Sequence, residues 1–167
     1  MKQMQTKKGQ KGFSLIELLI VVAIIGIIAA IAIPNLLSSR RAANEASAIS
    51  SMRVIISSEA TYSSTQTGGG YATLTGLKNA GLIDDKLGNA VSTSSTAAAK
   101  SGYWFDVAVT GTGSTATYFA GGNPNASSVG QRRFSAAQDG VIYADTVATY
   151  GSGGVPTTAT YGNPIGN

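Results

Sequence analysis

The feature that most constrains this chain is an apolar run near the N-terminus that contains one acidic residue. From Leu18 to Ile33 the chain contains only Leu, Ile, Val and Ala, apart from Gly26. Extended back to Phe13 the run has 21 residues, and only Ser14 and Glu17 among them are polar. As an α-helix this run would be ~31 Å long, enough to cross the hydrocarbon core of a bilayer. A segment that favours lipid therefore keeps one carboxylate.

The net charge of +4 comes from the peptide that precedes the apolar run. Four lysines and no acidic residue lie in the first 12 residues, whereas eight basic and eight acidic residues balance each other from Phe13 onward. Lysines on this side of a membrane span predict a cytoplasmic N-terminus, with everything after Pro34 outside. The balanced remainder does not indicate a nucleic-acid partner, and none is predicted.

A helical pattern continues beyond Pro34, so we predict one helix from about Ser14 to about Ser64 that is softened at the proline. Its second half is amphipathic, and Arg41 and Glu45 are spaced to pair weakly on its surface. The polar residues Ser51 and Glu59 fall outside the apolar stripe. That stripe consists of Ile49, Met52, Ile56 and Ala60.

The rest of the chain predicts a small antiparallel sheet. A glycine run, 68–70, ends the helix, and a short helical turn is expected at 77–80. Strand patterns occupy 102–109 and 115–121, and a second pair, 132–137 and 141–145, flanks the turn signal Asp139-Gly140. The aromatic residues of these strands are expected mainly in the core. They are Tyr103, Trp104, Phe105, Tyr118, Phe119, Phe134 and Tyr143.

The predicted fold class is α+β. A long N-terminal helix, membrane-spanning in its first half and amphipathic in its second, packs on an antiparallel sheet of about four strands. The expected segments are a basic leader (1–12), a hydrophobic transmembrane and polymerisation helix (13–34), its amphipathic continuation (35–66), a loop region (67–101), the sheet (102–145) and an irregular Gly/Thr-rich tail (146–167).

The stretch "KGFSLIELLIVVAIIGIIAAIAIP" resembles the N-terminal signature of type IV pilins and of the type II secretion pseudopilins. The matching features are a short basic leader ending in Gly12, the aromatic Phe13, a Ser-Leu-Ile-Glu sequence and an apolar helix that reaches Pro34. The chain has no cysteine, so it lacks the pair that closes the C-terminal loop of many pilins.

The resemblance implies a processing site and a set of partners. A dedicated prepilin peptidase in the membrane would cut between Gly12 and Phe13 and N-methylate the new amine of Phe13. The product would form a homo-oligomeric helical filament, driven by an assembly ATPase and an inner-membrane platform. It would be a single-pass inner-membrane protein before assembly, and afterwards part of an extracellular pilus or a periplasmic pseudopilus.

Elementary electrostatics gives Glu17 a role in subunit assembly. A carboxylate in lipid costs roughly 2–4 kcal/mol on insertion scales. Cutting at Gly12 creates an ammonium on Phe13, which Glu17 of a neighbouring subunit can neutralise, whereas an isolated subunit leaves both groups uncompensated. Gly26 permits close helix approach, and Pro34 permits bending during extraction from the bilayer.

Several alternatives remain open from the sequence. Ala30-Ile31-Ala32 fits an ordinary signal-peptidase site, and an uncut signal anchor is a third form of the N-terminus. The function that fits best is a major or minor type IV pilin, with adhesion, motility or DNA uptake as its role. A type II secretion pseudopilin and a non-polymerising, membrane-anchored binding domain are the two alternatives.

No enzyme is predicted, because the chain lacks His and Cys and has no phosphate-binding loop. No catalytic residue, metal or cofactor is expected. Arg132 and Arg133 are interpreted as a solvated strand edge rather than a DNA-binding surface. Calcium binding by aspartates is an alternative that no EF-hand-like spacing supports, and Asp139 is explained as a turn residue. The aspartates considered are Asp84, Asp85, Asp139 and Asp145.

Overall fold

The computed structural model describes residues 12–65, 69–91, 99–147, 149–151 and 162–165. They divide into two compact units, Met1–Leu37 and Ser38–Asn167, and each is described by itself. The leader residues 1–11 and part of the predicted tail lie outside the described residues.

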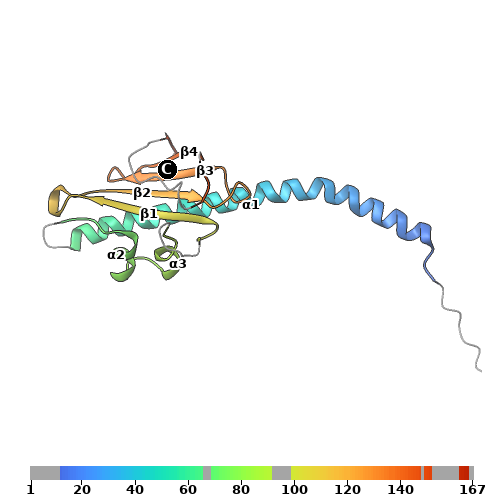
Figure 1. Cartoon of the computed structure of the whole chain (residues 1–167), viewed down its shortest axis with the longest axis horizontal. Coiled ribbons are helices and arrows are strands. Elements are labelled where there is room, and N and C mark those ends of the chain that lie inside the picture. Colours follow the sequence, from blue (N-terminus) through green and yellow to red (C-terminus); the bar gives the residue numbers. More distant parts are fainter. Residues whose placement is uncertain (1–11, 66–68, 92–98, 148, 152–161, 166–167) are drawn as a thin grey trace, which may run out of the picture. The chain divides into compact units, whose positions relative to one another are not determined.

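One helix, α1, runs through both units from Leu15 to Thr65 and confirms the predicted long helix to within one residue at each end (Figure 1). Pro34 lies inside α1, and the helix does not end there. In the first unit the described side chains are exposed, apart from the half-exposed Ala29. Nothing within this unit therefore covers its apolar residues.

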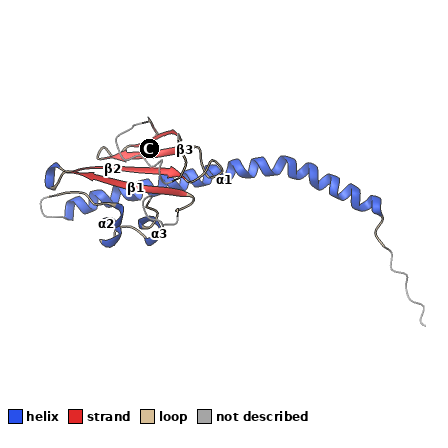
Figure 2. Cartoon of the chain, in the orientation of Figure 1, coloured by secondary structure: helices blue, strands red, loops and turns tan. Residues whose placement is uncertain are grey.

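The second unit holds a five-stranded antiparallel sheet, which confirms the α+β class (Figure 2). The strands are β1 (Tyr103–Thr110), β2 (Thr117–Pro124), β3 (Arg132–Ala137), β4 (Ile142–Thr146) and β5 (Asn163–Pro164). Their order in the sheet equals their order in the chain. The four predicted strands are present. The fifth lies in the tail that was predicted to be irregular, where it pairs with residues 143 and 144 of β4.

The β3–β4 turn is the hairpin that Asp139-Gly140 predicted. Gly140 has a φ of +69°, a conformation that glycine adopts at little cost. Asp139 Oδ1 accepts a hydrogen bond from the Val141 amide at 3.1 Å. The β1–β2 connection contains a short 3-10 helix, η1 (Gly113–Thr115), within the stretch predicted as a turn.

The core of the second unit lies between the end of α1 and the sheet. Ala48, Met52 and Ile55 of α1 are buried. Gly122 allows this packing, since a Cβ there would lie 3.1 Å from the Phe105 ring and 3.6 Å from Met52 Sδ. Most of the strand aromatics are buried, as predicted, and only two are half-buried, Trp104 and Tyr143. The buried ones are Tyr103, Phe105, Tyr118, Phe119 and Phe134.

The buried face of α1 is rotated relative to the predicted stripe. Ile49 and Ile56 are only partly buried, and Ala60 is exposed. Ser51 and Glu59, which were predicted to lie elsewhere, are buried. The predicted stripe was right for Met52 and in part for Ile49 and Ile56, which pack against the core. It missed Glu59, because the loop region supplies this carboxyl with a donor at Ala72, which a hydrophobicity pattern does not register.

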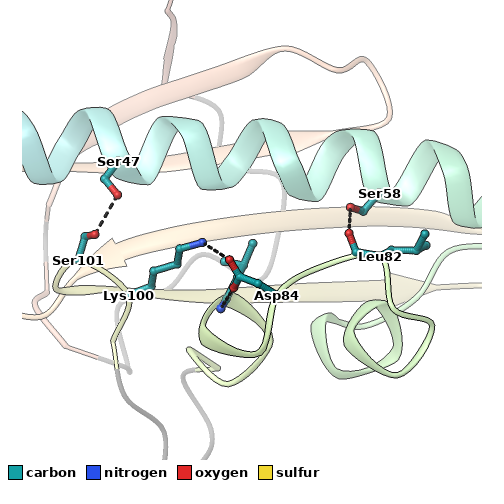
Figure 3. A network of polar contacts seen from close by, with 7 residues as sticks. Ser47, Ser58, Leu82, Asp84, Lys100 and Ser101 are labelled. Carbon is teal, nitrogen blue, oxygen red and sulfur yellow. Dashed lines mark hydrogen bonds and ion pairs between the residues drawn. The ribbon is translucent and has the colours of Figure 1, made fainter.

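The loop region folds into two short helices, α2 (Leu74–Asn79) and α3 (Asp85–Gly88), of which only the first was predicted. Asp84 Oδ1 caps α3 by accepting from the Leu87 amide at 2.6 Å. Asp84 Oδ2 also lies 3.1 Å from Lys100 Nζ (Figure 3). These contacts hold the pKa of the Asp84 carboxyl below its usual value, the Leu87 amide having the largest effect.

Candidate functional site

The predicted processing site lies just before α1. Gly12, Phe13 and Ser14 have no regular secondary structure, and Phe13 is 90% exposed. A Cβ placed on Gly12 would meet no atom within 4 Å. The described chain around Gly12 and Phe13 is therefore exposed and non-helical.

Glu17 caps the start of α1 in its own chain. The Ser14 amide donates to Glu17 Oε2 at 2.9 Å, and the helix begins at Leu15. Ser14 is thus the N-cap residue and Glu17 the third helical residue, the two positions of a capping box. The carboxylate thus has a neutral backbone donor that was not predicted, while none of the ion pairs in the described part of the chain includes Glu17. The Ser-x-x-Glu spacing could have revealed this contact from the sequence.

The surface around Glu17 is apolar. In the described residues 12–37 it is the only charged side chain. By length and composition α1 could cross a membrane, with a mean hydropathy of 3.1 over its best 18 residues. Gly26 leaves an open notch in this surface, because a Cβ there would meet nothing within 4 Å. The segment therefore offers one carboxylate on an uncovered apolar helix.

The two neighbouring arginines do not form a free basic surface. Arg132 Nη2 lies 2.8 Å from Glu45 Oε2, and Arg133 Nη2 lies 2.7 Å from Asp145 Oδ2. Both arginines lie at the start of β3, where the strand pairs with β4 alone, because the pairing with β2 begins at Phe134. Their interpretation as a solvated strand edge therefore fits the structure, with Arg132 exposed and Arg133 half-buried. Glu45 also accepts from the Gln131 amide at 2.9 Å and so pairs with β3 rather than with Arg41.

The aspartates considered for calcium have structural partners. Asp84 caps α3, and Asp85 Oδ1 lies 3.2 Å from Lys78 Nζ. Asp139 accepts from the Tyr143 hydroxyl at 2.9 Å, and Asp145 pairs with Arg133. Within the described ranges, no three His, Cys, Asp or Glu side chains gather in a way that could hold a metal ion.

Comparison with known proteins identifies the N-terminal segment. Residues 7–33 match the family described as the prokaryotic N-terminal methylation motif. The chain is 63% identical over 38 residues to the type IV wide pilus major component PilA4 of Thermus thermophilus. It is 82% identical over 28 residues to two fimbrial proteins of Pseudomonas aeruginosa. The predicted resemblance to this family is thereby confirmed.

The similarity is confined to a short part of each chain. It covers 23% of this chain and 29% of the Thermus protein, and 17% of this chain and 18% of each fimbrial protein. The chain therefore matches less than a third of the length of these curated relatives. No solved structure is a significant match.

Proposed function

We propose that this chain is the precursor of a type IV pilin, a structural subunit rather than an enzyme. In this proposal it is cut between Gly12 and Phe13, methylated on the Phe13 amine and polymerised into a helical surface filament. The observation that carries the proposal is the methylation motif at residues 7–33, within which the Gly12–Phe13 bond is exposed and non-helical. The same proposal assigns residues 1–12 to a removable leader.

The position of Glu17 supports a role in assembly. Its bond to the Ser14 amide satisfies part of the carboxylate, but a neutral amide does not cancel a charge in an apolar environment. Removal of the leader creates an ammonium at Phe13. Pairing of that ammonium with Glu17 of a neighbouring subunit would neutralise both groups and fix the axial register of the filament.

The uncovered helix supports the remaining assignments. Its apolar side chains would lie in the inner membrane before assembly and in the filament core afterwards, with Gly26 at close helix contacts and Pro34 as a point of flexibility. The prepilin peptidase, an inner-membrane platform and an assembly ATPase would be its partners. The names of the matched relatives, a pilus component and two fimbrial proteins, favour a pilus over a secretion pseudopilus or a non-polymerising anchor.

Mass spectrometry of the N-terminus of the native protein tests the proposal. We expect a mature chain that begins with N-methylated Phe13. A chain that begins at Ile33 would instead indicate cleavage after Ala32 by signal peptidase, and one that retains Met1 would indicate an uncut anchor. Either result would overturn the proposal.

A further inference from the structure

A second acidic residue of α1, Glu59, is completely buried in the second unit. Its Oε2 accepts a hydrogen bond from the Ala72 amide at 3.1 Å. Its Oε1 is also buried, and it has no hydrogen-bond partner among the described residues. A single bond from this carboxyl thus connects α1 to the segment 69–73, which returns the chain toward α2.

Among the described residues, no positive charge contributes to the pKa of Glu59, which is set by burial and by the Ala72 amide. None of the ion pairs in the described part of the chain includes it. Tyr118 of β2 is close enough to Glu59 for the carboxyl to affect its pKa, and its ring centroid lies 4.7 Å from that of Tyr71 in the returning segment. Asp139, in the β3–β4 turn, also acts on Tyr118. Ionisation of any of these groups adds negative charge.

Burial therefore favours the neutral carboxyl. Desolvation raises the pKa of Glu59 from 4.5 to about 7, against a smaller opposing effect of the Ala72 amide. The pKa of Tyr118 is raised too, first by burial and then by Glu59 and Tyr71. The carboxyl of Glu59 therefore changes its protonation near neutral pH.

The segment that Glu59 holds is suited to move. Gly69 and Gly70 have φ values of +75° and +127°, and they precede Tyr71 and Ala72 directly. Gly69 packs only at ordinary contact distance on Ser114 of η1, whose Cα would lie 3.6 Å from an added Cβ. These glycines permit other backbone conformations. Because Ala72 is buried in the core and Tyr71 packs against it, opening of the segment would expose both residues together with the carboxylate.

We propose that Glu59 is a proton-operated latch, which in its neutral form holds the segment 69–73 against α1 and which, once ionised, weakens that hold and lets the segment open. An ionised Glu59 would keep one buried oxygen unpaired, and opening of the segment would hydrate the carboxylate at the cost of the Ala72 hydrogen bond and of exposing Tyr71 and Ala72. The latch belongs to the second unit and does not depend on the proposed processing of the N-terminus.

The pKa of Glu59 can be measured directly in the full chain in detergent micelles. The chain has three glutamates, Glu17, Glu45 and Glu59, so carbon-13 labelling of the glutamate carboxyl gives three NMR signals. Glu59→Gln assigns its signal by loss. We expect a midpoint near 7 in the wild-type protein. A midpoint near 4.5 would overturn the proposal. The titration itself is done on the wild-type protein, and the Glu59→Gln variant is needed only to assign the signal.

Exchange of the Ala72 amide tests whether ionisation opens the segment. Carbonyl labelling of tyrosine with amide labelling of alanine marks only the two Tyr-Ala pairs of the chain, Tyr71-Ala72 and Tyr143-Ala144. After division by the intrinsic exchange rate, we expect the protection of Ala72 to fall ~30-fold from pH 5.5 to pH 8.5, as a pKa change from 4.5 to about 7 requires. Ala144, in β4, is the internal reference, and at each pH it should be more strongly protected than Ala72, because it need not open with the segment 69–73.

The variant Glu59→Gln keeps an acceptor for the Ala72 amide and removes the ionisation. Its Ala72 protection should not depend on pH, while Ala144 protection reports that the variant is folded. Equal pH dependence of Ala72 in both proteins would overturn the latch. So would equal protection of Ala72 and Ala144 at every pH in the wild-type chain, because both amides would then exchange only through global unfolding.

Discussion

The two halves of α1 belong to one continuous helix but meet opposite conditions. Between Leu15 and Leu37 nearly all the described side chains are apolar and exposed, with values such as 61% for Ile28; the polar exceptions are Glu17 and Asn35, and Ala29 is half-exposed. Between Ser38 and Thr65 the helix buries Met52 and Ile55 completely against its own sheet. The first half of α1 is the more apolar of the two, and yet it is the half whose side chains are exposed.

This contrast indicates where each half finds its partners. The second half finds many of its partners within its own chain: Glu45 pairs with Arg132 of β3, and Ser58 donates to the Leu82 carbonyl (Figure 3). The first half needs lipid or other copies of the chain, since burial of apolar surface is the main favourable term in both settings. Substitutions in the two halves should therefore affect different properties.

The largest expected effect on folding comes from Phe105→Ala, compared with Ile28→Ala. Phe105 is fully buried, so its truncation should lower the free energy of unfolding of the second unit by ~3–5 kcal/mol. Ile28→Ala should leave that free energy unchanged. Urea titration in mild detergent, followed by fluorescence of the single tryptophan, Trp104, measures both. An equal loss in the two variants would contradict the division between the halves.

The next effect is the pH dependence of that stability. The pKa of Glu59 is raised on folding, so the folded state binds more protons than the unfolded state between pH 4.5 and about 7. Stability contributed by the neutral carboxyl is fully present below pH 4.5 and falls as pH rises through 7, by about 3 kcal/mol in all. Urea titrations at pH 5 and pH 8 on the wild-type chain and Glu59→Gln should differ only in the wild-type chain.

The elements of this fold that local signals specify could be predicted from the sequence. The helix pattern, the strand alternation and the Asp139-Gly140 turn depend on neighbours in the chain, and their positions were nearly right. Contacts between distant segments could not be predicted, because the sequence does not say which polar groups meet. Glu45 lies 87 residues from Arg132, and Glu59 is buried only because the segment at Ala72 returns to it.

The candidate site was predictable for a different reason. An acid inside an apolar run stands out against its surroundings, so Glu17 needed no tertiary information. The C-terminal region offered no comparable signal. There Asn123 donates from Nδ2 to the carbonyls of Thr149 and Gly151, at 2.9 and 2.8 Å, and ties down a chain that has no disulfide. Nothing in the pattern around Asn123 marks it as an anchor.

Glu17 variants should separate helix capping from charge pairing. Gln at the third helical position still accepts from the Ser14 amide, whereas Ala does not, and neither carries a charge. If pairing with a Phe13 ammonium sets the register, both variants lose ~2 kcal/mol per subunit contact, and filament yield falls at least tenfold. Electron microscopy and quantification of sheared filaments measure the yield. Normal filaments from Glu17→Gln together with none from Glu17→Ala would assign the role to capping alone.

The smallest expected effect concerns Glu45, the acid that the second half of the helix satisfies in its own chain. Its carboxylate is 12% exposed and contacts both Arg132 and the Gln131 amide. Glu45→Gln should keep one of these bonds and lose the ion pair, which is worth ~1 kcal/mol because Arg132 remains half exposed. Urea titration of the full chain measures the loss, which should shrink in 1 M salt.

Asp85→Asn is the matched control for Glu45→Gln. Asp85 also pairs with a cation, Lys78, at 3.2 Å, but its side chain is 82% exposed. An exposed pair of this kind contributes a few tenths of a kcal/mol at most, so the two variants should differ. Filament yield should be far less sensitive to either than to Glu17→Gln, because Glu45 has its partner in cis. If Glu45→Gln instead lowered filament yield strongly while stability changed little, Glu45 would be a contact between subunits. The second half of α1 would then also depend on other copies of the chain, contrary to the contrast drawn above.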